Sequence, residues 1–242
     1  KMNLCIIVPC FNEAKRIPLA DFSKFLLNFP KVVIHFVNDG STDQTLNELL
    51  LFKKQHPKQV QIVDCKKNLG KGNAIQKAMQ LCIADKAYDT FAFLDADLST
   101  VPEECVLLAQ KIGQEVQFVF GSRIKKIDNE IDRKWSRFLI SRIIATVISK
   151  ILNLAVYDTQ CGCKIFTAQS ATIAFQDPFI SPWLFDVEIF FRLKKHFGAV
   201  RFKSLSLEIP LKKWKDQGES KIKWTYGFVL WFELYKIYKT YR

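Results

Sequence analysis

The stretch Phe91-Ala92-Phe93-Leu94-Asp95-Ala96-Asp97 joins a short apolar run to two acidic residues separated by one alanine. The apolar run predicts a buried β-strand, because aromatic and aliphatic residues follow one another without a polar face. Asp95 and Asp97 would then lie at the end of that strand. Two carboxylates in such a place can hold Mg²⁺ or Mn²⁺ while a diphosphate supplies further oxygens.

Similar apolar runs elsewhere in the chain predict further strands, and helical patterns separate the early ones. The strands are expected at Asn3–Val8, Val32–Val37, Val60–Val63 and Gln117–Gly121. The helices are expected at Pro18–Asn28, Asp43–Lys54 and Gly72–Asp85. This alternation predicts an α/β fold with a Rossmann-like, mainly parallel sheet flanked by helices. Ligands of such sheets bind at the carboxyl ends of the strands.

Polar motifs follow three of the predicted strands. They are Pro9-Cys10-Phe11-Asn12-Glu13, Asn38-Asp39-Gly40-Ser41-Thr42-Asp43 and Asn68-Leu69-Gly70-Lys71-Gly72-Asn73. Asp39 can accept a hydrogen bond from a base or ribose, and amides near Gly40 can face a phosphate. The third motif lacks the spacing of a P-loop, which excludes a P-loop NTPase. Lys71 is still a candidate to contact a diphosphate.

Two of these motifs also have a purely structural interpretation. The segment 95–97 is compatible with an acidic turn before a helix that has Ser99 or Thr100 as its N-cap. The segment 38–43 is a favourable turn sequence, with Ser41 or Thr42 as a helix cap. The structural and functional interpretations are compatible with each other.

Charge and cysteine content bound the class of protein. The 242 residues include 36 Lys and Arg against 24 Asp and Glu, a formal net charge of +12. That excess favours an anionic partner such as a nucleic acid, a phosphorylated ligand or an acidic lipid surface, or it is simply a solvated basic surface. The 7 cysteines show no CxxC pair and no Cys/His ligand spacing, which is typical of free thiols in a reducing compartment. With no signal peptide before the run Leu4–Val8, a cytoplasmic location is expected.

Two amphipathic helices are expected in the second half, at about 133–156 and 224–241. Each has a broad apolar face with internal charges, among them Arg142 and Lys150 in the first and Lys236 and Lys239 in the second. The charges argue against membrane-spanning helices. Basic residues beside Trp, Phe and Tyr favour a peripheral helix at a membrane surface. The alternative is that both helices pack on the sheet or on a partner subunit.

The motifs together resemble a known enzyme family. P-C-F-N-E (9–13), V-N-D-G-S-T-D (37–43), N-L-G-K-G (68–72), L-D-A-D (94–97) and G-S-R (121–123) are similar to those of family 2 glycosyltransferases. Asp158-Thr159-Gln160-Cys161-Gly162-Cys163-Lys164-Ile165-Phe166 resembles the dolichyl-phosphate glucosyltransferase pattern D-T-Q-C-G-F-K-L-F, with Cys163 in place of the usual Phe. Trp183–Glu188 and Trp214 with Gly218–Lys221 extend the resemblance over nearly the whole chain, although Glu219 is inserted relative to the family's G-S-K pattern.

The resemblance implies one GT-A domain over residues 1–242, with a nucleotide-sugar-binding half (1–123) and an acceptor-binding half (124–242). It implies a Mg²⁺ or Mn²⁺ site at Asp95 and Asp97. The residues implied to bind the nucleotide sugar are Pro9, Asn12, Glu13, Asp39, Lys71, Asp95, Ala96 and Asp97. The residues implied to bind the acceptor phosphate are Arg123, Arg137 and Ser141; Arg137 and Ser141 are four residues apart and share a helical face.

The catalytic residues implied by the resemblance are Asp158, Asp97 and Arg123. Asp158 is the usual candidate for the base. An acceptor phosphate has a second pKa of about 6 and is already mostly dianionic at neutral pH. Asp158 is therefore expected to position other groups or to remove a final proton. Asp186 and Glu188 are alternatives, and both also fit simple first-turn acids of a helix.

The function expected from this resemblance is inverting transfer of a hexose, glucose by analogy, from a UDP-linked donor to a polyprenyl or dolichyl phosphate. An acceptor with a glycan hydroxyl is the alternative, and it would require Asp158 or Asp186 as a true base. A non-enzymatic protein that binds nucleic acid is disfavoured. The chain has no RRM, zinc-finger or helix-turn-helix signature, and its Asp95/Asp97 edge would repel phosphate without a cation.

Overall fold

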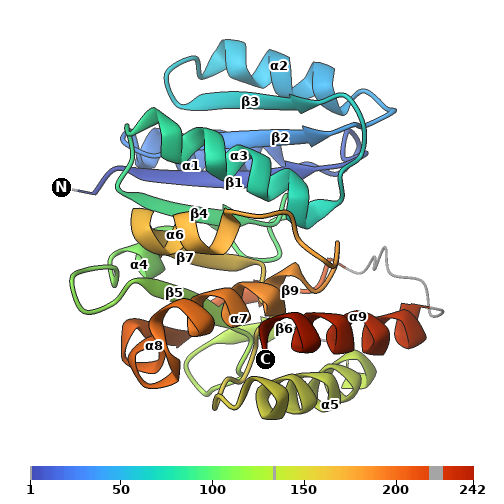
Figure 1. Ribbon diagram of the computed structural model, residues 1–242. Helices are drawn as coiled ribbons and strands as arrows, with labels where there is room; N and C mark the ends of the chain where they lie inside the picture. The colour runs from blue at the N-terminus through green and yellow to red at the C-terminus, as the bar shows by residue number, and fades with distance from the viewer. Residues whose placement is uncertain (1, 133–134, 218–225) are drawn as a thin grey trace.

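The structure is a computed structural model that describes residues 2–132, 135–217 and 226–242. Its centre is a seven-stranded sheet of order β3-β2-β1-β4-β7-β5-β8, and β6 and β9 pair separately (Figure 1). The strands are β1 (Leu4–Cys10), β2 (Val33–Asp39), β3 (Val60–Cys65), β4 (Thr90–Leu94), β5 (Phe118–Ser122), β6 (Glu130–Asp132), β7 (Cys163–Thr167), β8 (Ser206–Pro210) and β9 (Lys213–Lys215). The helices are α1 (Leu19–Asn28), α2 (Thr45–Gln55), α3 (Lys71–Asp85), α4 (Pro102–Ala109), α5 (Trp135–Leu152), α6 (Ala168–Phe175), α7 (Phe185–Phe197), α8 (Ala199–Leu205) and α9 (Tyr226–Tyr241).

The first half confirms the predicted βαβ pattern. β1 pairs in parallel with β2 and with β4, and β2 pairs in parallel with β3. Each predicted strand and helix of this half begins and ends within two residues of an observed strand or helix. Because these strands run in the same direction, the loops after β1, β2 and β4 reach one edge of the sheet.

The expected helix caps are wrong. α4 begins at Pro102 with Val101 as its N-cap, so neither Ser99 nor Thr100 caps it. α2 begins at Thr45 with Gln44 as its N-cap, which excludes Ser41 and Thr42. The carboxylate of Asp43 instead accepts from the Thr45 backbone N–H at 3.0 Å, one or two residues closer to the helix than the expected caps.

Two strands of the seven-stranded sheet, β7 and β8, are not among those expected from the sequence. β7 lies between β4 and β5 and runs antiparallel to both. Its first residue, Cys163, pairs with Leu94, the last residue of β4. The segment that precedes β7 therefore ends beside the end of β4, next to Asp95.

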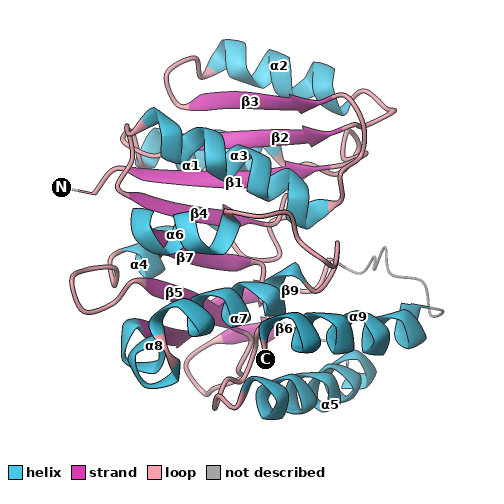
Figure 2. Cartoon of the chain, viewed as in Figure 1, coloured by secondary structure: helices cyan, strands magenta, loops and turns pink. Residues whose placement is uncertain are grey.

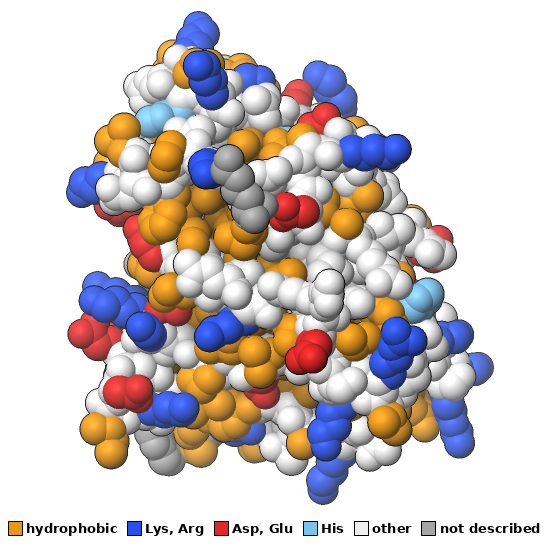
Figure 3. All heavy atoms as spheres, turned by 90° about the vertical axis from the view of Figure 1, so that its left-hand side faces the viewer, with side chains coloured by type: hydrophobic (Ala, Val, Ile, Leu, Met, Phe, Trp, Pro, Cys, Tyr) orange, Lys and Arg blue, Asp and Glu red, His pale blue; other side chains and the backbone are white. Residues whose placement is uncertain are grey.

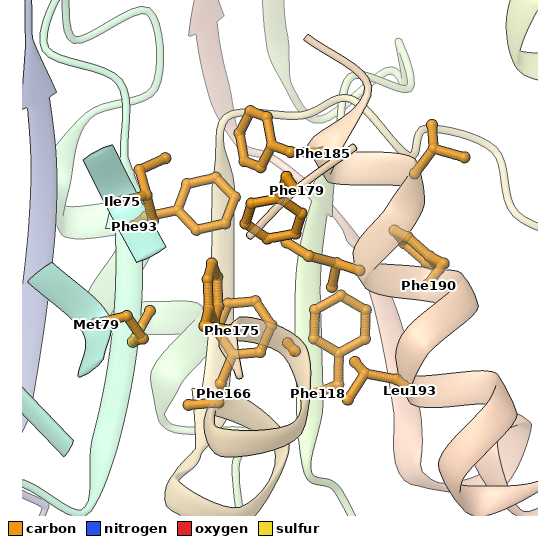
Figure 4. Close-up of a cluster of buried hydrophobic side chains, with 14 of the residues drawn as sticks. Ile75, Met79, Phe93, Phe118, Phe166, Phe175, Phe179, Phe185, Phe190 and Leu193 are labelled. Atoms are coloured by element: carbon orange, nitrogen blue, oxygen red, sulfur yellow. The ribbon is translucent and has the colours of Figure 1, made fainter. Parts of the chain in front are cut away.

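Helices cover both faces of the sheet (Figure 2). The core beneath α3, α6 and α7 is rich in aromatic residues, and Phe93, Phe118, Phe166, Phe175 and Phe190 point toward one another there (Figure 4). The rings of Phe118 and Phe166 stack with centroids 5.0 Å apart, and Phe190 meets Phe118 edge-on at 5.2 Å. The second core, beneath α1, α2 and α4, is mainly aliphatic. Together the two cores hold the strands rigidly and thereby fix the loops at their ends.

The two amphipathic helices are confirmed as α5 and α9, which both pack against α7. Their buried faces include Ile148 and Leu152 from α5 and Leu234 and Ile237 from α9. Residues 133, 134, 224 and 225, and the motif Gly218–Lys221, lie outside the described residues. Within the part of the chain that is described, no helix combines the length and the apolar character needed to span a bilayer.

The face at which β1 begins is opposite to the edge where the polar loops lie. Figure 3 shows this face, with Lys and Arg side chains spread around it rather than gathered in one patch. On this face the positive charge therefore does not form the continuous stripe typical of a nucleic-acid interface.

Candidate active site

The carboxylate of Asp95 lies against the backbone of Gly162, in the loop that leads into β7. A Cβ atom added to Gly162 would lie 2.0 Å from Asp95 Oδ2, so a larger residue would displace the carboxylate. The pairing of Leu94 with Cys163 brings the two loops together. Position 162 therefore needs glycine because of a close approach, and the motif 158–162 forms one wall of the site.

Asp97 completes the acidic pair in a tight turn. Its Oδ1 atom accepts from the Ser99 backbone N–H at 2.9 Å, and Leu98 between them has a positive φ of 52°. Burial raises the pKa of Asp97, and the neighbouring Asp95 charge raises it further. The two carboxylates repel each other, which a bound cation would relieve.

Lys71, the first residue of α3, places its ammonium 2.5 Å from Asp95 Oδ1. Desolvation alone would lower the pKa of Lys71, but the charges of Asp95 and then Asp186 outweigh it and raise that pKa. A cation already sits beside Asp95, and the available donors are hard carboxylate oxygens. These residues fit Mg²⁺ or Mn²⁺.

A second buried ion pair, Lys164 with Asp186, lies behind the acidic pair. Lys164 Nζ is 2.5 Å from Asp186 Oδ1 and donates to the Cys161 carbonyl at 2.7 Å, and its side chain is 0% exposed. Burial raises the pKa of Asp186 despite the opposing effects of Lys164 and Lys71. The sequence reasoning missed Lys164. The available signal was a lysine flanked by Cys163 on one side and by Ile165 and Phe166 on the other.

The first-turn interpretation of Asp186 and Glu188 is confirmed, since both lie in the first turn of α7. Both are also buried and paired, which that interpretation did not include. Glu188 Oε1 is 2.7 Å from Arg192 NH2 and accepts from the Tyr241 hydroxyl at 2.8 Å. Glu188 therefore joins α7 to α9, whereas Asp186 faces the site.

Arg123 and Asp158 form a two-bond ion pair. Arg123 Nε lies 2.7 Å from Asp158 Oδ2, and its NH2 lies 2.9 Å from Oδ1. Burial would raise the pKa of Asp158, but the attraction of Arg123 outweighs burial and lowers it to about 2. A carboxylate with so low a pKa is a weak base. Its geometry fits the expected positioning role, in which it holds the Arg123 guanidinium in place.

Arg123 and Asp158 line a small recess of about 10 Å³ together with Ser141 and Arg142 of α5. Arg142 donates to the Tyr157 carbonyl at 2.6 Å and stacks over the Tyr157 ring at 3.6 Å. Sequence reasoning did not assign Arg142 to the site. The backbone of Arg137 belongs to α5, but its side chain lies outside the described residues.

Glu208 of β8 supports this recess from behind. Its carboxylate accepts from the backbone N–H groups of Tyr157 and Asp158, at 2.9 and 2.8 Å. Burial raises the pKa of Glu208, and these two hydrogen bonds oppose that effect. Nothing in the local sequence around Glu208 marks it as part of the site.

A larger cavity of about 560 Å³ opens on the other side of the Asp95–Ser99 loop. Leu98 and Ser99 line it from that loop, and Trp214 of β9 lines it from the opposite side. The Arg123 guanidinium lies 5.4 Å from the Trp214 ring centroid. Trp214 therefore lines the cavity and also lies near the Arg123 side chain.

The loops after β1 and β2 are tied to each other. Asn12, with a φ of 52°, accepts from the Thr42 backbone N–H at 2.8 Å through its Oδ1. The Glu13 backbone N–H donates to Thr45 Oγ1 at 2.8 Å, and the Glu13 carboxylate pairs with Arg16. Asn12 and Glu13 therefore lie at the predicted edge of the sheet. Their hydrogen bonds to Thr42 and Thr45 hold the loops after β1 and β2 together.

Asp39 ends β2 and connects it to the loop before α3. Its Oδ1 accepts from the Leu69 backbone N–H at 2.7 Å, and burial raises its pKa. Gly40 follows with a φ of 65°, and a Cβ there would lie 2.4 Å from the backbone of Lys67. Pro9 pairs with Val37 on the neighbouring strand, and Ala96, between Asp95 and Asp97 in the sequence, is buried. The predicted nucleotide-binding residues thus all lie at one sheet edge.

The sequence of this chain matches a family model, Glycosyl transferase family 2, over residues 5–172. That match covers more than half of the 242 residues. The chain belongs to glycosyl transferase family 2. Membership of this family favours an enzyme over the alternative of a nucleic-acid-binding protein without catalytic activity.

Similar family 2 relatives carry dolichyl-phosphate beta-glucosyltransferase names. One from Trichomonas vaginalis is 29% identical over 90% of this chain and 65% of its own length. One from Dictyostelium discoideum is 30% identical over 79% of this chain and 62% of its own length. The human protein is 26% identical over 90% of this chain and 73% of its own length. This glycosyltransferase chain thus spans a little under two thirds of the length of the first two relatives.

The fold of this glycosyltransferase is the GT-A fold. Glucosyl-3-phosphoglycerate synthase from Mycobacterium tuberculosis, in a complex with UDP, superposes with a TM-score of 0.67 at 14% identity. The superposition covers 98% of this chain and 80% of the synthase chain. A second structure of that synthase, with Mn²⁺, UDP-glucose and phosphoglyceric acid, has a TM-score of 0.62 and covers 89% of this chain at 15% identity. The predicted α/β, mainly parallel GT-A architecture is confirmed, with antiparallel β7 as an addition.

Proposed function

We propose that this family 2 glycosyltransferase transfers a hexose, glucose, from a UDP-linked donor to the phosphate of a polyprenyl or dolichyl lipid, with inversion. The observation that carries the proposal is the guanidinium of Arg123, held by two bonds to Asp158 at the wall shared with Asp95. The Arg123 guanidinium can bind one anion, while a metal cation held by Asp95 and Asp97 binds a second anion. The dolichyl-phosphate names of the relatives support the lipid phosphate as that anion.

The donor would bind at the edge formed by residues 1–123. Asp95 and Asp97 would hold Mg²⁺ or Mn²⁺, and the cation would offset the charge of the departing nucleoside diphosphate. Crystals of the M. tuberculosis synthase with Mn²⁺ and UDP-glucose support this choice of metal and donor. Lys71 would keep its positive charge beside Asp95, where the diphosphate oxygens arrive.

The acceptor would bind on the side formed by residues 124–242. We assign its phosphate to Arg123, Arg137 and Ser141, the first and last of which line the small recess beside Asp158. A lipid phosphate is mostly dianionic at neutral pH and attacks without prior removal of a proton. Asp158 then has one task, which is to hold the Arg123 guanidinium toward that phosphate.

The lipid would reach the site from a membrane surface, on the cytoplasmic face, against α5 and α9. Trp231, Phe232 and Tyr235 of α9 are 45%, 59% and 60% exposed, and Ile143 of α5 is 64% exposed. Lys236 is exposed on α9, where it lies over the Phe232 ring at 4.5 Å. Exposed aromatic residues beside a basic residue are typical of an interfacial helix.

The experiment that tests the proposal measures nucleoside diphosphate release from a panel of UDP- and GDP-sugars. Each donor is tried with Mn²⁺ or Mg²⁺, with and without a short polyprenyl phosphate. The proposal expects release from UDP-glucose that depends on both the metal and the lipid phosphate. Metal-dependent release that is indifferent to the lipid would overturn the acceptor assignment and move the acceptor to a glycan hydroxyl or to water.

A further inference from the structure

Cys5, His35 and Cys82 meet in the interior, at the end of the sheet opposite to Asp95. Cys5 lies near the start of β1, His35 is in β2 and Cys82 is in the last turns of α3. Cys5 pairs with Val33, so His35, two residues farther along β2, projects from the same face of the sheet. Within the described residues, these three side chains each bring a ligand atom within 4.8 Å of the other two.

The separations suit one small ion. In a tetrahedral zinc site with Zn–S of about 2.3 Å and Zn–N of about 2.0 Å, two ligand atoms lie roughly 3.5–3.8 Å apart. Small side-chain movements would bring the three atoms to that spacing. Two thiols and an imidazole form a set that favours Zn²⁺ over Mg²⁺ or Mn²⁺, which prefer oxygen ligands. The cluster therefore differs in chemistry from the carboxylate pair at the other edge.

His35 has the partner that a metal-binding histidine needs. Its Nε2 lies 3.0 Å from the Tyr88 hydroxyl, and the two rings meet edge-on with centroids 5.7 Å apart. Such a contact orients the imidazole and leaves Nδ1 as the nitrogen to bind an ion. Tyr88 comes from the segment between α3 and β4, so a fourth part of the chain supports the cluster.

We propose that Cys5, His35 and Cys82 bind a Zn²⁺ ion that stabilises the fold. The ion would join α3 to the strands β1 and β2. α3 begins with Lys71, the residue that contacts Asp95, so the ion would fix the far end of the helix that delivers that lysine. The site is not recognisable in the sequence. Cys5 and His35 are 30 positions apart, and His35 and Cys82 are 47 positions apart, which is longer than the usual Cys/His spacing of a zinc site.

The test uses the whole protein, stripped of metal under reducing conditions and titrated with Co²⁺ as a spectroscopic probe. The expected result is a thiolate-to-cobalt charge-transfer band in the near ultraviolet that saturates at one equivalent and that Zn²⁺ removes. The Cys82→Ser and Cys5→Ser variants lose the band. Tyr88→Phe keeps it and binds about 10- to 100-fold more weakly.

Two controls separate this site from others. Asp97→Asn should keep the band, because a carboxylate gives no thiolate-to-cobalt transition. Cys65→Ser should also keep it, because Cys65 is a buried cysteine outside the cluster. Absence of the band in the reduced wild-type protein would overturn the proposal, whatever the folding of the variants.

Discussion

Asp97 carries a charge that its surroundings disfavour, because burial and the Asp95 carboxylate both raise its pKa. We expect Asp97→Asn to lower the transfer rate on the order of 100-fold or more, since in the proposed site the metal ion would lose one of its two carboxylate ligands. The thermal midpoint should not fall, because the substitution removes a repulsion. Sugar transfer and circular dichroism melting measure the two effects. Retained transfer would contradict the metal assignment.

Gly162 is a residue whose small size the acidic pair requires. A Cβ at that position would lie 2.0 Å from Asp95 Oδ2 and 2.4 Å from Asp95 Cγ. Gly162→Ala should therefore reduce activity strongly and lower the thermal midpoint, because the backbone and the carboxylate must move apart. Gly113→Ala is the matched control, since nothing lies within 4 Å of a Cβ there. Equal behaviour of the two variants would show that the approach of Gly162 to Asp95 has no consequence.

Asp158 stabilises the fold through Arg123, and the effect depends on pH. Its folded pKa of about 2 lies below the ordinary value of 3.8, so its stabilisation is present above pH 3.8 and is lost as the pH falls through 2. Asp158→Asn should cost about 3 kcal/mol at neutral pH, because Arg123 is left buried without its partner.

Urea unfolding at several pH values checks this expectation. The difference in unfolding free energy between wild type and Asp158→Asn should shrink from about pH 4 toward pH 2. Asp128→Asn, at an exposed position, serves as the control and should show little difference at any pH. A loss for Asp158→Asn that is the same at pH 7 and pH 3 would mean that the ion pair is not its cause.

At the level of elements, the sequence predicted those that repeat a pattern and missed several that depart from it, β7 among them. β1 to β4 and α1 to α3 follow from alternating apolar runs and helical periodicity. β7 is a five-residue strand after a polar loop, and its antiparallel place between β4 and β5 depends on long-range pairing. Its lysine also interrupts the apolar run, although Lys164 is paired with Asp186 and needs no solvent.

Substitutions on the exposed face of α9 can test whether this helix binds a membrane surface. Trp231→Ser with Phe232→Ser should reduce co-sedimentation with acidic vesicles at least several-fold, because the interfacial anchors are removed. Folding should be unaffected, since both side chains are exposed and the buried Leu234 and Ile237 remain. Leu50→Ser with Leu51→Ser on α2 is the matched control, with side chains 43% and 53% exposed. Equal binding by both double variants would exclude α9 as the docking face.

At the level of the whole molecule, the site is the product of one sheet edge. The sequence predicted which loops reach that edge because parallel strands share a direction. It did not predict the supports behind them, because Glu208 lies 50 residues from Asp158, whose backbone it holds. Arg142 is likewise recognisable only once α5 is packed beside residues 157 and 158. Residues that support others carry no local motif, and only the folded chain reveals them.

The net charge of +12 is a property of the whole chain, and it should act on membrane binding separately from α9. Binding to acidic vesicles should weaken as salt rises from about 0.1 M to about 1 M, because the screening length falls from about 10 Å to about 3 Å. The vesicle binding that remains at high salt should be lost in the variant with Trp231 and Phe232 substituted, since salt does not screen the burial of apolar surface. Binding that salt abolishes completely would mean that charge alone holds the enzyme at the membrane, and binding indifferent to salt would mean that the charge serves another anion.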